Sequence, residues 1–402
     1  MRGRLLHLSM GVLEAALATA LAVTLVGCSS AKNAGGQSGS GSSSSGPIKI
    51  GAILSLTGPY AALGASEKNS LEMEQKRIND AGGINGRQIQ ILIEDDGTDE
   101  AKAVAAATKL IEQDKVAAIL GATGTGESMA VRTVIDRSGV PEISMAGGNA
   151  ITGKFDPLVF QTPWTNAIIV PYVLKKIAAD GHTKIAVISD DGGYGKDGLA
   201  IITTDAPAAG LTIVSNQTFK TGDTDFAAQL TNIKNSGADA VLLYTAGAEG
   251  AAIVKQADAL GLKLPWYGGS GQARVQFIQG AGPASEGFIF GTGKSLLPSN
   301  WGTGTAEANL VNDFATRYKA AYNAAPDIFA GHAFDALLIL TDTLKRGGGS
   351  TDPAQLRDAI EKTSGLVGFA GTFTFSPTDH NGLTSDDLAL YKIQNGQWTA
   401  TQ

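Results

Sequence analysis

The fold is decided by the stretch Ile48-Lys-Ile-Gly-Ala-Ile-Leu-Ser-Leu56, which is followed by Thr57-Gly58-Pro59. A short run of apolar and β-branched residues is typical of a strand, and Thr-Gly-Pro predicts a turn. Residues 65–80 then have the pattern of a helix, and Gly82-Gly83 is a typical helix end. This order predicts the first unit of a parallel α/β sheet.

Short apolar strands and helices keep alternating along the rest of the chain. In the first half, strands are expected at residues 88–94, 116–120 and 141–145, and helices at 100–113 and 126–138. After Thr162-Pro163-Trp164, helices are expected at 168–180, 198–209, 226–236 and 250–260, and strands at 185–189, 212–217, 240–244 and 265–268. The pattern predicts an α/β protein of two lobes, each a parallel sheet flanked by helices with right-handed crossovers.

The last third of the chain is expected to return to the first lobe. Residues 288–293 read as a crossing, and 306–322 and 330–346 as long helices. Residues 364–374 and 388–393 are expected to complete the sheets. Two sheets that face each other leave a cleft between them, and the crossing segments can act as hinges.

Composition limits the class of protein. The chain has 402 residues, a length that suits two lobes, and a formal net charge of −7. No cluster of Lys and Arg is present, which argues against nucleic acid as a partner. The four histidines, His7, His182, His332 and His380, are scattered singly. No metal site or cofactor is therefore expected.

The first 47 residues are expected to direct location rather than fold. Arg2 and Arg4 precede an apolar stretch over 15–26, which predicts a secretory signal over 1–28. Leu25-Val26-Gly27-Cys28 resembles a bacterial lipobox, in which the cysteine carries lipid, and Cys28 is the only cysteine. The alternative is an ordinary secretory signal with an incidental cysteine. The Ser/Gly-rich residues 29–47 predict a flexible linker.

The loops after the strands are the expected place for a binding site, because ligands bind outside the carboxyl ends of open parallel sheets. These loops, at residues 57–64, 121–128, 146–149, 190–195, 245–249 and 268–271, are rich in glycine and hydroxyl side chains. The helix start at Gly126, with the Thr125 and Ser128 hydroxyls, can seat a carboxylate or phosphate. The alternative is that short loops need glycine and a Ser or Thr cap for structural reasons alone.

The motifs argue against an enzyme. Gly121-Ala-Thr-Gly124-Thr-Gly126 follows the third strand, and its spacing differs from the Gly-x-Gly-x-x-Gly of dinucleotide-binding enzymes. Met145-Ala-Gly-Gly stands where the acidic residue of that motif belongs. No Gly-x-Ser-x-Gly elbow with triad partners occurs in the sequence.

Several motifs resemble the periplasmic leucine/isoleucine/valine-binding proteins of ABC transporters, which have the type I periplasmic-binding-protein fold. The most specific is Asn79-Asp-Ala-Gly-Gly-Ile-Asn-Gly-Arg87, followed by Gln88-Ile-Gln-Ile-Leu-Ile-Glu-Asp95. The segments 51–59, 186–195 and 373–377 add to the likeness. The resemblance implies an N-terminal lobe of residues 48–162 and 292–374 and a C-terminal lobe of 163–291 and 375–402.

The resemblance also implies a ligand site. Thr125, with Gly126 at the helix start, matches the group that holds the ligand carboxylate. The loop after the fourth strand offers the Ala146 carbonyl, but Gly148 stands where a hydroxyl is expected. Tyr194 matches the tyrosine that closes over the ligand, and Leu63 takes the place of a pocket aromatic, with Tyr60 nearby.

One departure bears on the ligand. Amino-acid binders of this family place a carboxylate in the late loop of the second lobe to pair the ligand ammonium, and Ser270 stands there instead. Asp190, Asp191, Glu127 or Glu249 can substitute for it. The ligand is therefore an amino acid or another small carboxylate, an amide or an aromatic acid. Trp164 can stack on such a ligand or simply pack at the hinge.

The expected function is that of the extracytoplasmic solute-binding component of an ABC importer. Its expected partners are a small ligand, the permease subunits and the membrane, the last through lipid on Cys28, and the protein is expected to be a monomer. An alternative is a surface sensor that presents its ligand to a receptor. A DNA-binding regulator of the same fold is opposed by the export signal and by the missing basic helix–turn–helix.

Overall fold

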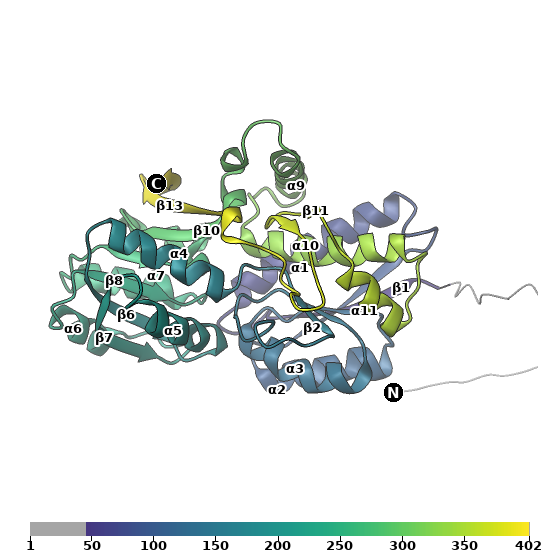
Figure 1. Cartoon of the computed structure of the whole chain (residues 1–402), viewed down its shortest axis with the longest axis horizontal. Helices are drawn as coiled ribbons and strands as arrows, with labels where there is room; N and C mark the ends of the chain where they lie inside the picture. Colours follow the sequence, from purple (N-terminus) through teal and green to yellow (C-terminus); the bar gives the residue numbers. More distant parts are fainter. Residues whose placement is uncertain (1–45, 402) are drawn as a thin grey trace, which may run out of the picture. The chain divides into compact units, whose positions relative to one another are not determined.

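Strands and helices alternate along residues 46–401, the part of the chain that the computed structural model describes (Figure 1). They form two larger sheets and one small two-stranded sheet. The predicted α/β class with parallel sheets flanked by helices is confirmed. The predicted signal segment 1–28 with Cys28, and the linker up to residue 45, lie outside the described residues. Within residues 46–401, no helix has the length and apolar content needed to span a membrane.

The first sheet has five parallel strands in the order β2-β1-β3-β4-β5. They are β1 (Ile48–Leu54), β2 (Ile89–Asp95), β3 (Ile119–Gly121), β4 (Glu142–Ser144) and β5 (Val159–Gln161). The helices α1 (Ala61–Asp80) and α10 (Ile328–Arg346) pack together, as do α2 (Glu100–Thr108) and α3 (Thr125–Ser138).

Alternation along the strands explains the two helical layers. In β1, Ile50 and Leu54 belong to the core that includes buried residues of α1 and α10. Ile53 points the other way, into the core formed with α2 and α3. A strand that is apolar on both faces has to be covered on both faces, which is the arrangement of a buried parallel sheet.

The second sheet has seven strands in the order β7-β6-β8-β9-β10-β13-β14. Five are parallel: β6 (Lys184–Asp190), β7 (Thr212–Phe219), β8 (Ala240–Tyr244), β9 (Trp266–Gly268) and β10 (Ile289–Gly293). The last two, β13 (Leu388–Gln394) and β14 (Gln397–Thr401), are antiparallel.

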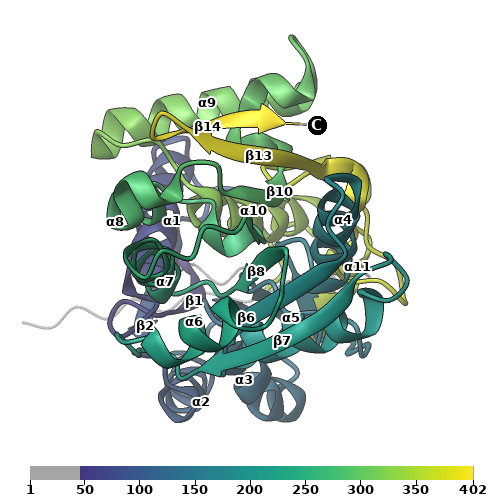
Figure 2. The same ribbon diagram turned by 90° about the vertical axis from the view of Figure 1, so that its left-hand side faces the viewer.

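Helices cover both faces of the second sheet. These are α4 (Asn166–Ala179), α5 (Gly193–Asp205), α6 (Ala227–Lys234), α7 (Glu249–Ala259) and α8 (Val275–Ala281). Figure 2 shows α7 and α8 on one side of the strands and α4 on the other. The helix α4 packs against α5, and α7 against α6 and α8.

The chain passes between the two sheets three times: after β5, after β10 and before β13. After β10 it forms α9 (Ala306–Tyr322), α10 and α11 (Pro353–Glu361), and both α9 and α10 contact α1 of the first sheet. The first and third connections lie side by side. The Gln161 N–H donates to the His380 carbonyl at 3.0 Å, and Asn381 Nδ2 donates to the Pro163 carbonyl at 2.7 Å.

Some elements differ from prediction. Residues 364–374 do not extend either large sheet; they form the separate hairpin β11 (Leu366–Val367) and β12 (Thr372–Phe373). This hairpin is fixed by the Asp335 carboxylate of α10, which accepts the N–H groups of Phe369 and Ala370. The strands β5 and β14 and the helices α8 and α11 were not predicted, because elements of three to nine residues carry little periodic signal.

The helix α5 begins at Gly193, five residues before its predicted start. A Cβ on Gly195 would lie 2.2 Å from the Asp190 carbonyl, and one on Gly193 would lie 2.5 Å from the Gly126 nitrogen. Glycine at these positions therefore serves a close backbone approach rather than a loop. The approach brings the start of α5 directly against the start of α3.

Candidate functional site

A cavity lies where the carboxyl ends of the parallel strands of the two sheets face each other. Its walls come from the loops after β1, β3, β4, β6, β8 and β9, from the connection after β5, and from α10. It offers about 40 Å³ to the centres of water-sized molecules. One water needs roughly 10–15 Å³ by this measure, so the cavity has room for a few waters or one small solute.

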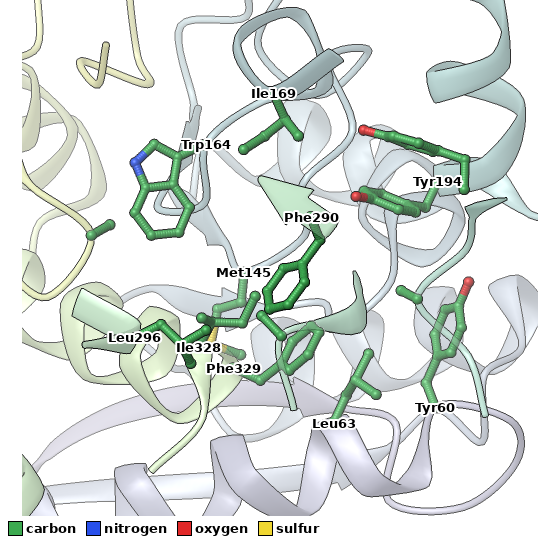
Figure 3. Packing of buried hydrophobic residues seen from close by; sticks show 14 of the residues in the cluster. Tyr60, Leu63, Met145, Trp164, Ile169, Tyr194, Phe290, Leu296, Ile328 and Phe329 are labelled. Atoms are coloured by element: carbon green, nitrogen blue, oxygen red, sulfur yellow. The ribbon is translucent and has the colours of Figure 1, made fainter. Parts of the chain in front are cut away.

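Six of the eight residues predicted for the ligand site line this cavity: Tyr60, Leu63, Thr125, Ala146, Tyr194 and Ser270. In Figure 3, Leu63 and Tyr60 project from the segment at the start of α1, and Tyr194 lies above Tyr60 in the view. The other two predicted residues, Gly126 and Gly148, do not line it. Gly126 instead lines a shallow surface hollow with Gly193.

The position of Thr125 explains why a glycine, rather than a larger residue, stands at position 148. A Cβ on Gly148 would lie 2.2 Å from Thr125 Cγ2 and 2.8 Å from Thr125 Oγ1. A serine or threonine at position 148, which the family resemblance implies, would therefore collide with Thr125.

The start of α3 supplies hydrogen-bond donors to the cavity. Its N-cap residue is Gly124, which has no side chain to cap the first-turn N–H groups. The hydroxyl of Thr125 is buried and has no partner among the described residues. The neighbouring Thr123 hydroxyl differs, because it donates to Glu67 at 2.5 Å and accepts the Ser55 N–H at 3.0 Å.

Ser128, the other hydroxyl expected at this helix start, is not available. It accepts the Ala122 N–H at 3.1 Å and bonds the Ser144 hydroxyl at 2.8 Å. Both contacts tie the third and fourth strand ends to α3. Ser128 is therefore a structural residue, and Thr125 is the hydroxyl of this turn that faces the cavity.

Two more buried polar atoms on the cavity wall have no partner within residues 46–401. They are Nε1 of Trp164 and Nδ1 of His332. Burial lowers the pKa of His332 to about 3, so its ring is neutral at pH 7. An indole N–H only donates, whereas a neutral imidazole nitrogen donates or accepts according to its tautomer.

Tyr194 forms part of the wall that the second sheet contributes. Its ring stacks on Tyr244 with centroids 5.1 Å apart, and the Tyr244 hydroxyl donates to Asn166 Oδ1 at 2.6 Å. A Cβ on Gly147 would lie 3.2 Å from the Tyr194 ring. Tyr194 therefore lies against the loop after β4, which belongs to the first sheet.

The carbonyls of the loop after β4 are already hydrogen-bonded. The Ala146 carbonyl accepts Gln161 Nε2 at 2.6 Å, and the Gly147 carbonyl accepts the Asn166 N–H at 3.0 Å. Gln161 Nε2 also donates to the Gly148 carbonyl at 3.0 Å. Ala146 thus lines the cavity as expected, but its carbonyl oxygen is occupied by a side chain of the protein.

A carboxylate connects the two sheets beside the cavity. Asp197 of α5 accepts the N–H groups of Asn149 at 2.7 Å and Ala150 at 3.0 Å, both in the loop after β4. It also accepts Asn166 Nδ2 at 2.7 Å. Asp197 does not line the cavity, so its bonds hold the two walls together without touching a bound solute.

Three buried acids surround Tyr60 on its outer side: Asp190, Glu127 and Glu249. Burial, and then these three charges, raise the pKa of Tyr60. Asp190 accepts the Gly192 N–H at 2.9 Å and Glu249 the Gly222 N–H at 2.6 Å. None of the three acids lines the cavity.

Several wall residues were not anticipated. Ala246 and Gly271 lie in loops that had been considered, whereas Ile328, Phe329 and His332 come from α10. These three share one face of the helix, being spaced by one, three and four positions. Nothing local distinguishes them from core residues, so only the return of the chain to the first sheet could have identified them.

Comparison with known proteins agrees with this architecture. Residues 47–397 match the model of a family described as periplasmic binding protein. Leu/Ile/Val-binding protein homolog 3 of Brucella melitensis biotype 1 is 28% identical over 355 residues, which cover 87% of this chain and 92% of that protein.

Solved structures share the fold over the same extent. An extracellular ligand-binding receptor from Rhodopseudomonas palustris HaA2 superposes with a TM-score of 0.84 at 25% identity, covering 88% of this chain and 99% of the other. The branched-chain amino acid transporter substrate-binding protein of Streptococcus pneumoniae, solved in complex with isoleucine, gives a TM-score of 0.78 at 28% identity, covering 88% and 98%. With most of its length matched to the family model, this chain belongs to the periplasmic binding protein family.

Proposed function

We propose that this chain is the extracytoplasmic solute-binding component of an ABC importer and that it acts as a binding protein rather than an enzyme. One observation carries the proposal: a small cavity is enclosed by strand-end loops of two sheets, with Thr125 on one side and Tyr194 on the other. A solute that contacts both walls stabilises the state in which they meet. The family membership and the relatives named for branched-chain amino acids support the same role.

The proposed moving parts are two lobes, residues 48–162 with 292–374 and residues 163–291 with 375–402. The three connections between the sheets would act as hinges. The solute, an amino acid or a related small molecule, would contact Tyr60, Leu63, Thr125, Tyr194 and Ser270 directly. Ala146 would line the solute, Gly126 would act only as part of the start of α3 outside the cavity, and Gly148 would act by leaving room for Thr125.

The proposed setting is the outer face of a cell membrane. Lipid on Cys28 would hold the protein there, residues 29–47 would serve as the tether, and the closed monomer would dock on the permease subunits. A sensor would share the cavity but not the permease, so uptake separates the two roles. Deletion of the gene should abolish uptake of the solute, and a Cys28→Ser variant should release the protein from the membrane fraction.

Binding is tested with purified protein and a panel of small solutes in a thermal unfolding assay. A solute at 100 times its Kd stabilises the folded state by about 2.7 kcal/mol, which raises Tm by several degrees. We expect at least one amino acid or small carboxylate to do so, and small-angle scattering to show a smaller radius of gyration when it is added. If no member of a broad panel changes Tm, the proposed function is wrong.

A further inference from the structure

We propose that the solute of this cavity is a small carboxylate with an apolar body and no ammonium group. This inference rests on the proposed function, because it assumes that the cavity binds a solute. It is carried by the wall of the cavity, which offers donors and apolar surface but no charge to pair a cation.

The Thr125 hydroxyl suits an acceptor, because Thr125 Oγ1 is buried and has no partner among the residues described. Trp164 Nε1 is also buried without a partner there, but Figure 3 shows this nitrogen on the side of the ring away from Tyr60 and Tyr194. Thr125 stands at the start of α3, a helix of fourteen residues whose N-cap is a glycine and whose dipole favours an anion. Glu127 bonds its own N–H in this first turn, so the Thr125 hydroxyl is the donor left for a solute, and a carboxylate is an acceptor only.

An ammonium group would have no comparable partner. Within residues 46–401, no Asp, Glu, Lys or Arg lines the cavity. Burying an ammonium group without an opposite charge is strongly unfavourable, so it has to be paired or excluded. On the opposite wall, the Ser270 hydroxyl is 3.5 Å from the Gly291 carbonyl and cannot supply a charge.

Backbone acceptors around the cavity are also engaged. The Ala146 and Gly147 carbonyls accept Gln161 Nε2 and the Asn166 N–H. On the opposite side, the Thr245 carbonyl accepts Gln272 Nε2 at 2.8 Å. An amino acid would thus bring three N–H donors to a wall on which these carbonyls already have donors and His332 Nδ1 is a neutral acceptor without a partner in residues 46–401.

The buried acids nearby do not change this conclusion. Asp190 accepts the Gly192 N–H and Glu249 accepts the Gly222 N–H, and each keeps one buried oxygen without a partner among the described residues. Together with Glu127 they surround Tyr60 and lie outside the cavity wall.

The other residues of the wall determine which apolar group the solute can carry. Leu63, Met145, Trp164, Ile328 and Phe329 give it a largely apolar and partly aromatic lining (Figure 3). Apolar surface of this kind favours a branched aliphatic or phenyl group. The small size of the cavity favours a short acid over a long chain.

Matched pairs of compounds test the inference directly. Each pair consists of an amino acid and the same acid without its ammonium group: L-leucine and 4-methylpentanoate, L-valine and 3-methylbutanoate, L-phenylalanine and 3-phenylpropanoate. Affinities are measured by isothermal titration calorimetry on the purified protein. We expect the acid without the ammonium to bind at least about tenfold more tightly in the best pair, and its carboxamide to bind more weakly than the acid.

The outcomes separate this inference from the proposed function. If the amino acids bind as tightly or more tightly, the inference is overturned, while the proposed function stands. If none of the compounds binds, the inference also fails, and the broad solute panel then decides whether the cavity binds any solute.

A pair of variants adds a test within the protein. Ser270→Asp places a carboxylate on the wall, whereas Ser270→Asn adds nearly the same bulk without charge. We expect Ser270→Asp to weaken binding of the acid and to strengthen binding of the matching amino acid, each by about tenfold, and Ser270→Asn to leave the preference unchanged. Circular dichroism and Tm verify folding, and the same change in both variants would contradict the inference.

Discussion

The starts of α3 and α5 lie against each other and have the same kind of N-cap, but their polar groups have different hydrogen-bond partners. Each helix follows a parallel strand and has a glycine as its N-cap, without a side-chain cap. At α5, the Asp190 carboxylate accepts the N–H groups of Gly192 and Gly195. At α3, the Thr125 hydroxyl faces the cavity without a partner in the described part of the chain.

The difference shows that a helix start can bind a solute only where its hydrogen-bond donors are not already bonded to groups of the protein. An acid placed before the helix, as Asp190 is, closes the site with a charge of its own. The acid of α3, Glu127, comes inside the first turn and does not line the cavity. At α3 the Thr125 hydroxyl is thus left for a solute although Glu127 bonds its own N–H, whereas at α5 the Asp190 carboxylate bonds the N–H groups of Gly192 and Gly195.

The largest expected effect concerns Glu127. Burial, with smaller contributions from Asp96, Glu100 and Asp99, raises the pKa of Glu127 from 4.5 to about 7. Because the folded state holds its proton more tightly than the unfolded state, the stability that this proton confers is full below pH 4.5 and is lost as the pH rises through about 7. The Glu127→Gln variant should therefore gain stability relative to wild type over this range.

Urea unfolding at pH 5 and pH 8 measures this effect. At roughly 1.4 kcal/mol per pH unit, the difference in free energy of unfolding between variant and wild type should change by about 3 kcal/mol. Asp190→Ala, which removes the acceptor of the Gly192 and Gly195 N–H groups, should instead lose about 1 kcal/mol at pH 8. A pH-independent difference for Glu127→Gln would show that this carboxyl is not desolvated.

The second prediction concerns the open helix start. Thr125→Val keeps the shape of the side chain but removes its hydroxyl, and hydrogen bonds to charged groups contribute about 1.5–3 kcal/mol. Affinity for a carboxylate solute should therefore fall by roughly thirtyfold with little change in Tm. Thr125→Ser, which keeps the hydroxyl, is the matched control and should bind within a few-fold of wild type. Equal affinities for Thr125→Val and Thr125→Ser would mean that the anion is not held at α3.

The sequence alone predicts many of the residues that line the cavity. Strand-end loops are expected to carry the site, and Thr125 and Tyr194 line the same cavity from opposite sides. The rule works because the carboxyl ends of parallel strands share one edge of a sheet. Residues of α10 were missed, since Phe329 and His332 reach the cavity by a connection that no local pattern encodes.

The electrostatics of the site could not be predicted from residue types. Asp190 and Glu249 were reasonable substitutes for the acid that Ser270 replaces, but each accepts a backbone N–H nearby and lies off the wall. The Ala146 carbonyl was a reasonable ligand contact, but Gln161 occupies it. In each case a hydrogen bond formed by the tertiary structure decided which group remained available.

The third prediction concerns the aromatic wall of the second sheet. Tyr194→Ala removes a buried ring that stacks on Tyr244 and lies against Gly147. Because the lost apolar contact weakens the closed state, affinity should fall by roughly tenfold while the protein remains folded. Tyr194→Phe, which keeps the ring, should bind nearly as wild type. If calorimetry gives an unchanged affinity for Tyr194→Ala, α5 does not contribute to the binding site.

The smallest expected effect concerns Asp197, which joins α5 to the first sheet without touching the cavity. Asp197→Asn replaces one acceptor oxygen with an N–H₂ group that opposes the N–H donors of Asn149 and Ala150. The solute contacts remain, so only the equilibrium between open and closed states should change, and affinity should fall by about threefold through faster dissociation.

Asp205→Asn is the matched control for Asp197→Asn, because it makes the same charge change at the far end of α5. Small-angle scattering should give Asp197→Asn a larger radius of gyration than Asp205→Asn before the solute is added, and the same value when both are saturated. If the two variants differ at saturation, Asp197 shapes the closed state itself. If the two variants have the same radius of gyration in both conditions, the hydrogen bonds between α5 and the loop after β4 do not hold the walls together. The solute alone would then bring the starts of α3 and α5 together.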